Sequence, residues 1–295
     1  MLSIKVCNVN LDNPTVLASG ILGMSGKLLV RVAKNGAGAV TTKSISLKER
    51  KGHKNPTVLA GKDFLTNAVG LSNPGVKEFM DEIRYAIKYS NVPVIVSIFA
   101  STIKEFGLVT KEISNKPDFI EVNISCPNVE DEFGKPFACD EKDVADVTKT
   151  VKANTKIPVI VKLSPNVEDI GMIARAVEKA GADAISAINT VGPEKNEFLA
   201  NKEGGISGPR IRKIALEKVS EIYKSVKLPI IGIGGVTYGK DAIEMIKAGA
   251  SAVGIGSAVY FRGIDVFKKV CDEMKTWMKA NNYKSIDELI GLSHC

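Results

Sequence analysis

One cysteine in the chain lies among residues that could perform chemistry. Cys126 belongs to the stretch N-I-S-C-P-N at 123–128, directly after an apolar run of strand type. A lone cysteine is more often a small buried hydrophobic residue than a catalyst, but this one follows a strand end among polar side chains. A thiol acts as a general base once nearby positive charge lowers its pKa. Lys43 is the candidate for that charge, and neither His53 nor His294 is a convincing activator.

Polar residues also end the other predicted strands. They are Ser19, Lys43, Ser44, Ser97, Asn123, Lys162, Asn189 and Thr190. Lysine and asparagine at the end of an apolar strand are energetically costly unless a ligand or another partner satisfies them. For any single residue, a structural hydrogen bond is as good an explanation as a ligand. The set taken together favours a binding site.

Glycine-rich turns follow the last two predicted strands, as I-G-G-V-T at 233–237 and G-I-G-S at 254–257, and a further one, G-G-I-S-G, lies at 204–208. Backbone N–H groups of such turns bind phosphate, and α/β barrels commonly do so after strands 7 and 8. The glycines at 232–235 superficially resemble a dinucleotide fingerprint, but Thr237 stands where its last glycine belongs and the place in the fold is wrong. A nicotinamide-binding Rossmann unit is therefore disfavoured.

Strands that alternate with helices must position these residues. Eight strand candidates lie near residues 15–19, 39–44, 94–98, 119–123, 159–163, 184–189, 230–233 and 252–256. Three of them open on a proline followed by a β-branched run, and three follow a phrase that predicts a glycine at the end of a helix. Helical patterns such as 168–180 and 238–248 separate the strands. Eight such units predict a single (β/α)8 barrel over residues 1–295, with an excursion over its mouth at 44–75.

Composition narrows the class of protein. With 44% hydrophobic and 25% charged residues, the 295-residue chain is neither disordered nor a disulfide scaffold. Its five cysteines form no C-x-x-C pair, which argues for a reducing compartment and against a zinc or iron–sulfur site, so we expect no metal. No apolar run approaches the ~20 residues that span a bilayer, and the N-terminus has no signal-peptide pattern. We therefore expect a cytoplasmic protein that does not enter a membrane.

The formal charge of +7 has two interpretations. Most lysines are interleaved with acids, as on solvated helix faces. The densest basic stretch, 48–54, has no interleaved aromatic residues and no nucleic-acid motif. Attraction of small anionic ligands is the better interpretation, and we expect no nucleic-acid partner.

The motifs together resemble those of the dihydroorotate dehydrogenases, over nearly the whole chain and in order. They are A-S-G at 18–20, T-K-S at 42–44, N-A-V-G-L at 67–71 with N-P-G at 73–75, N-I-S-C-P-N at 123–128, V-K-L at 161–163, I-N-T at 188–190, G-I-S-G at 205–208, G-G at 234–235 and G-S at 256–257. Cysteine at 126, where the membrane-linked class 2 enzymes have serine, indicates class 1. The phrases I-G-I-G-G-V and I-G-S-A are more similar to the type B catalytic subunit than to type A.

The resemblance implies a (β/α)8 (TIM) barrel with FMN at the carboxyl end of its strands. It implies oxidation of dihydroorotate to orotate in UMP synthesis: Cys126 would take the C5 proton while the C6 hydride passes to N5 of FMN. The implied substrate-binding residues are Lys43, Asn67, Ala68, Val69, Gly70, Leu71, Asn123, Asn128, Asn189 and Thr190. Those implied for FMN are Ser19, Lys43, Ser44, Ser97, Asn123, Lys162, Ile188, Gly208, Gly234, Gly235, Gly256 and Ser257. The segment 128–140 would be the lid that carries the base.

The resemblance also implies a partner, because this chain has neither a cysteine cluster nor a dinucleotide fold with which to pass electrons to NAD. Type B relatives form a homodimer that joins a second subunit carrying FAD and a [2Fe–2S] cluster, as a heterotetramer. Three alternatives stay open: a fumarate-linked type A enzyme, a related dihydropyrimidine dehydrogenase, and a barrel that binds a phosphorylated metabolite without redox chemistry. His53 and Cys139 are given no role.

Overall fold

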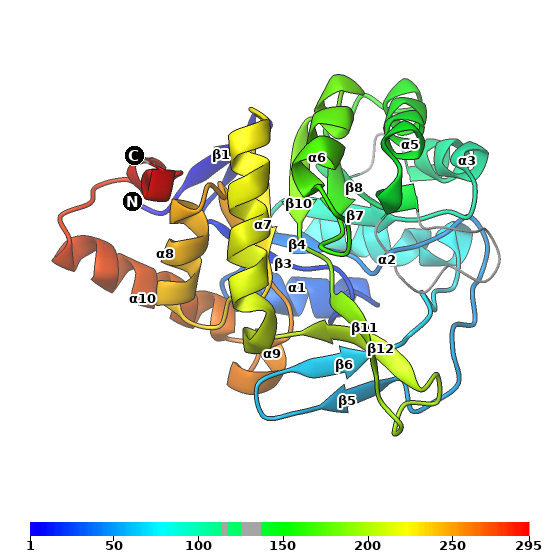
Figure 1. Cartoon of the computed structure of the whole chain (residues 1–295), viewed down its shortest axis with the longest axis horizontal. Coiled ribbons are helices and arrows are strands. Elements are labelled where there is room, and N and C mark those ends of the chain that lie inside the picture. Colours follow the sequence, from blue (N-terminus) through cyan, green and yellow to red (C-terminus); the bar gives the residue numbers. More distant parts are fainter. Residues whose placement is uncertain (114–116, 125–136, 295) are drawn as a thin grey trace.

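Eight parallel strands close into a barrel in the computed structural model, which describes residues 1–113, 117–124 and 137–294 (Figure 1). The order around the barrel is β10-β13-β14-β3-β4-β7-β8-β9. The bounds are β3 (Thr15–Leu17), β4 (Ala39–Thr41), β7 (Val94–Ile98), β8 (Phe119–Asn123), β9 (Val159–Leu163), β10 (Ala184–Ala187), β13 (Ile230–Ile233) and β14 (Ala252–Ile255). All eight predicted strands and the predicted barrel are confirmed.

The repeated proline phrases occupy equivalent places in the barrel. Proline has no N–H to donate, but its carbonyl can still join the hydrogen-bonded ladder. The carbonyl oxygens of Pro93, Pro158 and Pro229 each accept a backbone hydrogen bond of 3.0 Å from the neighbouring strand. Each proline therefore begins a strand at the amino end of the barrel, where the missing N–H does no harm.

Helices form the outer layer, as Figure 1 shows. They are α1 (Gly26–Lys34), α2 (Val76–Tyr89), α3 (Ile103–Ile113), α5 (Glu141–Ala153), α6 (Ile170–Lys179), α7 (Arg212–Ser225), α8 (Gly239–Lys247), α9 (Ala258–Arg262) and α10 (Val266–Ala280). The predicted helical patterns at 168–180 and 238–248 correspond to α6 and α8. The predicted terminal glycines Gly36, Gly181 and Gly249 have φ of 96°, 92° and 118°, as expected of helix ends. No helix in the described part of the chain is long and apolar enough to cross a membrane.

An antiparallel sheet of four strands lies beside the barrel, at the bottom of Figure 1. Its order is β11-β12-β6-β5, with β5 (Val58–Ala60), β6 (Leu65–Asn67), β11 (Val191–Lys195) and β12 (Glu203–Ser207). Strands β5 and β6 come from the excursion predicted at 44–75, and strands β11 and β12 follow β10 in the chain. A hairpin of β1 (Ile4–Val6) and β2 (Val9–Leu11) lies at the opposite end, where the Cys7 thiol donates to the Asp183 carbonyl just before β10.

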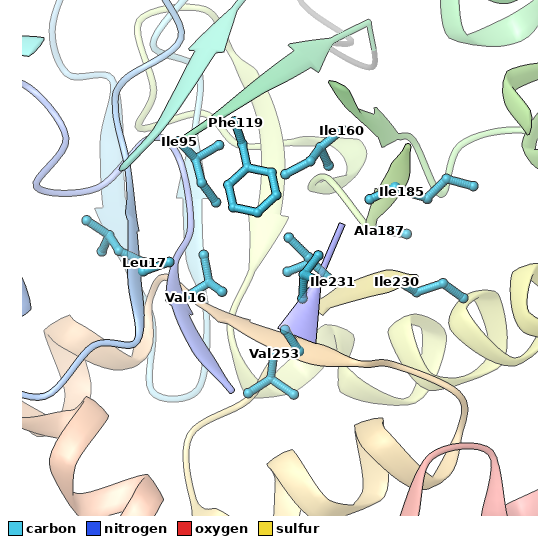
Figure 2. Close-up of a cluster of buried hydrophobic side chains, with 14 of the residues drawn as sticks. Val16, Leu17, Ile95, Phe119, Ile160, Ile185, Ala187, Ile230, Ile231 and Val253 are labelled. Carbon is cyan, nitrogen blue, oxygen red and sulfur yellow. The ribbon is translucent and has the colours of Figure 1, made fainter. Parts of the chain in front are cut away.

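The barrel interior changes from apolar to polar along the strands. Figure 2 shows Ile95, Phe119 and Ile160 pointing toward one another inside the ring of strands. Side chains two apart on a strand face the same side, so the next inward residues on these strands are polar: Ser97, Glu121 and Lys162. All three are buried. The polar layer lies toward the carboxyl end, where a barrel carries its site.

Candidate active site

A cavity of about 310 Å³ opens at the carboxyl ends of the barrel strands. Ligand sites commonly enclose ~300–1,000 Å³ and combine apolar walls with a few convergent polar groups. Strand-end residues of β3, β4, β8, β9, β13 and β14 contribute to its lining. Val58, Leu65 and Asn67 of the antiparallel sheet line it too. The predicted excursion over the barrel mouth is thereby confirmed, and it brings a wall of its own to the site.

Most of the predicted site residues come together in this cavity. Its lining includes Ser19, Lys43, Ser44, Asn67, Val69, Gly70, Leu71, Asn123, Lys162, Ile188, Asn189, Thr190, Gly208, Gly234, Gly235, Gly256 and Ser257. Ala68 and Ser97 are fully buried and do not line it. Cys126 and Asn128 lie outside the described residues, so their predicted roles stay predictions. The described residues on either side of 125–136 are joined by a hydrogen bond, which the Ala138 N–H donates to the Ile124 carbonyl.

Lys162 brings a buried positive charge to the cavity. Its residue is only 4% exposed, and its ammonium donates to the Ser19 hydroxyl at 3.0 Å. Within the described ranges, Lys162 forms no ion pair with any Asp or Glu. Burial of a charge is costly unless a partner compensates it. Lys162 is therefore suited to a ligand that carries or gathers negative charge.

Two glycines after β13 let the backbone approach the cavity closely. Gly234 and Gly235 have φ of 136° and 73°, which other residues rarely adopt. A Cβ added at Gly234 would lie 2.5 Å from the Cβ of Ala215, and one at Gly235 would lie 3.0 Å from the carbonyl oxygen of Gly208. No side chain fits here, so the turn presents only backbone to the cavity.

Asp241, at the start of α8, forms hydrogen bonds with the backbone that directly follows this turn. It is 1% exposed, and its carboxylate accepts from the N–H groups of Thr237 (3.0 Å) and Tyr238 (2.8 Å). The guanidinium of Arg212 donates to its other oxygen. Sequence reasoning missed both residues. The usable signal is an acid three residues after Tyr238, the position from which a side chain bonds back to the first N–H groups of a helix.

The loop 67–71, predicted to bind substrate, is supported by part of the basic stretch. Arg50 donates through Nε to the Gly70 carbonyl at 2.9 Å. The His53 ring lies 3.1 Å from the Ala68 carbonyl through Nδ1, and the His53 N–H donates to the Val69 carbonyl at 3.1 Å. Gly70 packs so closely on His53 that a Cβ there would lie 2.8 Å from the ring. These two basic residues therefore shape the cavity wall, which sequence reasoning had not assigned to them.

Asn189 and Thr190, which follow β10, also line the cavity. The Asn189 side-chain oxygen accepts from the N–H of Thr190 at 2.8 Å, and Asn166 donates to the Thr190 carbonyl at 3.3 Å. A Cβ at Gly205 would overlap the Thr190 side chain. Because Gly205 has no side chain, there is room for Thr190, a polar residue that lines the cavity.

The fold and the cavity together define a (β/α)8 barrel of the ligand-binding type, with a phosphate-suited turn, a buried cation and amide side chains at one mouth. The family described as dihydroorotate dehydrogenase matches residues 1–278. A dihydroorotate dehydrogenase B (NAD(+)) catalytic subunit of Methanocaldococcus jannaschii is 46% identical over 100% of this chain and 98% of its own length. Proteins of the same name from Pyrococcus abyssi and Thermoplasma acidophilum are each 43% identical, over 99% of this chain and 99% and 98% of theirs. The chain belongs to the dihydroorotate dehydrogenase family.

Proposed function

We propose that this chain is the FMN-dependent catalytic subunit of an NAD-linked dihydroorotate dehydrogenase, which oxidises dihydroorotate to orotate in pyrimidine synthesis. The observation that carries the proposal is the convergence of a buried cation, a glycine turn and amide side chains in one cavity. Relatives that span the full chain carry this name, which supports the assignment.

The residues present fit FMN. Lys162 offers a buried ammonium with a single hydroxyl partner among the described residues, which suits the edge of a flavin that becomes negative on reduction. The Gly234–Gly235 turn offers backbone to a phosphate, as do Gly256 and Ser257 after β14. FMN, when bound, supplies the acceptor for the hydride that leaves C6 of dihydroorotate.

The chain's own side chains would then bind the substrate and move the proton. Amides suit a pyrimidine because each offers a donor and an acceptor without charge, and we assign this role to Asn67, Asn123, Asn128 and Asn189. The hydroxyl of Thr190 would assist them. Lys43 and the backbone at Gly70 and Leu71 would bind the carboxylate. Cys126, as thiolate, would take the proton from C5.

Electrons must leave through another protein if NAD is the acceptor. The relatives' printed name, catalytic subunit, supports a partner. We propose a homodimer of this chain, a single domain over 1–295, bound to a subunit that carries FAD and a [2Fe–2S] cluster. We place the assembly in the cytoplasm because a thiol base needs a reducing compartment. Purification from the native host, followed by assays with NAD and with fumarate, tests this. Activity with fumarate and no co-purifying subunit would instead indicate a type A enzyme.

The substrate assignment is tested on the purified chain without oxygen. Dihydroorotate should bleach the visible absorbance of the bound flavin within one turnover, and dihydrouracil should not. Bleaching by dihydrouracil alone would favour a dihydropyrimidine dehydrogenase. Colourless protein that releases no flavin on denaturation would favour a phosphometabolite-binding barrel.

A further inference from the structure

A buried carboxylate lies beneath the cavity and has no part in the mechanism above. Glu121 on β8 is 3% exposed and lies two residues before Asn123, on the same side of the strand. Figure 2 shows Phe119, two residues earlier, pointing into the barrel. The carboxylate oxygens of Glu121 accept hydrogen bonds from the hydroxyls of Ser97 (3.0 Å) and Ser186 (2.9 Å). In the described part of the chain it forms no ion pair with a lysine or arginine.

A chain of hydrogen bonds connects this carboxylate to the cavity. A hydroxyl has one proton, so it can donate only once. Ser97 donates its proton to Glu121, so in the 2.9 Å contact between the Ser44 and Ser97 hydroxyls Ser44 must be the donor. Ser44 can then only accept from Asn123, whose Nδ2 lies 3.1 Å away. The carboxylate therefore sets the direction of every bond up to Asn123.

We infer that Glu121 is a positioning residue that fixes the orientation of the Asn123 amide, and so decides that Asn123 presents its oxygen as an acceptor to an N–H of the pyrimidine. An amide's nitrogen and oxygen ends have nearly the same shape, so the hydrogen bonds determine which end faces the ligand. With Nδ2 bonded to Ser44, we assign the oxygen to the cavity, which Asn123 lines. The inference rests on the proposed function, since it assumes a pyrimidine ligand with ring N–H groups.

Replacement of Glu121 by a group without an acceptor should reverse the chain. In Glu121→Met the Ser97 proton has lost its acceptor, and a buried hydroxyl left unsatisfied is unfavourable. Ser97 then donates to Ser44, Ser44 donates to Asn123, and the amide turns its oxygen away from the cavity. The N–H groups of the Asn123 amide then face the ring N–H of the pyrimidine, and no hydrogen bond forms between them. Loss of the hydrogen bond between Asn123 and the pyrimidine should weaken orotate binding about 10–100-fold.

Glu121→Gln separates this effect from the loss of charge. The glutamine oxygen can still accept from Ser97 while its nitrogen donates to Ser186, which can reverse its hydroxyl. Both directions of the chain are then allowed, and a site whose competent form is half populated binds about twofold more weakly. Ser186→Ala is the matched control, because it removes a hydrogen bond to the same carboxylate without touching the chain to Asn123.

The experiment measures orotate binding to each FMN-loaded protein by perturbation of the flavin spectrum, with 1-methylorotate and 3-methylorotate as ligands that each lack one ring N–H. FMN content and the unfolding temperature are recorded in parallel. The wild type should prefer orotate to one of the methylated ligands. That preference should disappear in Glu121→Met and persist in Glu121→Gln and Ser186→Ala.

Two results would overturn the inference while leaving the proposed function intact. One is equal orotate affinity and preference in the wild type and Glu121→Met. The other is a Glu121→Gln protein as impaired as Glu121→Met, which would mean that charge matters and hydrogen-bond direction does not. If Glu121→Met fails to fold, Glu121→Gln still decides: it should bind orotate about twofold more weakly than Ser186→Ala, and equal affinity in these two variants would overturn the inference. Failure of the wild type to bind orotate at all would instead refute the proposed function.

Discussion

Replacement of Lys162 by methionine should stabilise the FMN-free protein and weaken FMN binding. An isolated buried ion carries a penalty of several kcal/mol, and the one hydrogen bond from Lys162 to Ser19, at 3.0 Å, offsets about 1.5–3 kcal/mol of it. Methionine has a similar length, fits apolar surroundings and carries no charge. We expect Lys162→Met to raise the unfolding free energy of the FMN-free protein by about 2 kcal/mol.

The same change removes the cation proposed to face the flavin. A charge-assisted hydrogen bond contributes about 1.5–3 kcal/mol, so FMN affinity should fall about 10–150-fold. Urea unfolding of FMN-free protein gives the first quantity, and quenching of flavin fluorescence on binding gives the second. The two effects have opposite signs, which separates a binding role from a structural one.

Lys152→Met is the matched control. Lys152 pairs with Asp183 at 2.6 Å on the outside of the barrel, with both side chains about one-third exposed. Loss of this pair should lower stability by about 1 kcal/mol and leave FMN affinity unchanged. A Lys162→Met protein that is less stable without FMN, or that binds FMN as tightly as the wild type, would refute a flavin-facing role for this buried cation.

Four further substitutions test other parts of the structure. Gly234→Ala should destabilise the protein by about 1–3 kcal/mol in urea unfolding, because its Cβ would overlap a neighbour and its φ is positive. Gly256→Ala, whose nearest neighbour would be 3.7 Å away, should keep stability and lose only FMN affinity, so equal stability losses would contradict the account. Asp241→Ala should lower the unfolding free energy by about 1–3 kcal/mol, because it leaves the N–H groups of Thr237 and Tyr238 without their acceptor; an unchanged urea midpoint would show that these bonds do not stabilise the turn. Burial raises the pKa of the Cys271 thiol to about 11, so the folded state favours the neutral form and stability should fall as pH rises from about 9 toward 11. Cys271→Ala should flatten that fall, and an equally steep pH profile in the variant would refute the assignment.

The barrel could be predicted because its strands carry strong local signals. The apolar runs after Pro93, Pro158 and Pro229 lie in strands buried on both faces, where β-branched residues pack well. The antiparallel sheet could not be predicted in the same way. Strand β5 is three residues long and partly exposed, and β6 pairs with β12 across about 140 residues of sequence. No local pattern encodes that pairing.

The site was predictable where polar residues end a strand, because a parallel barrel brings these ends to one mouth. Ser97 shows the limit of that rule: it lies one layer deeper, where its hydroxyl bonds Ser44 and Glu121 and does not reach the cavity. The role of Glu121 could not be predicted from the sequence, because the residue lies within a strand and its hydrogen-bond partners are hydroxyls on β7 and β10. The support of the 67–71 loop by Arg50 also depends on a long-range contact that the sequence does not record.

The reaction proposed for this cavity is the oxidation of dihydroorotate with Cys126 as the base. Single-turnover flavin reduction without oxygen, compared between the wild type, Cys126→Ala and the control Cys7→Ala at equal FMN content, tests it most directly. Cys7 lies at the opposite end of the barrel and should be without effect. We expect Cys126→Ala to retain FMN and lose reduction rate by orders of magnitude, as for removal of a general base. Reduction at the wild-type rate in Cys126→Ala would contradict the account.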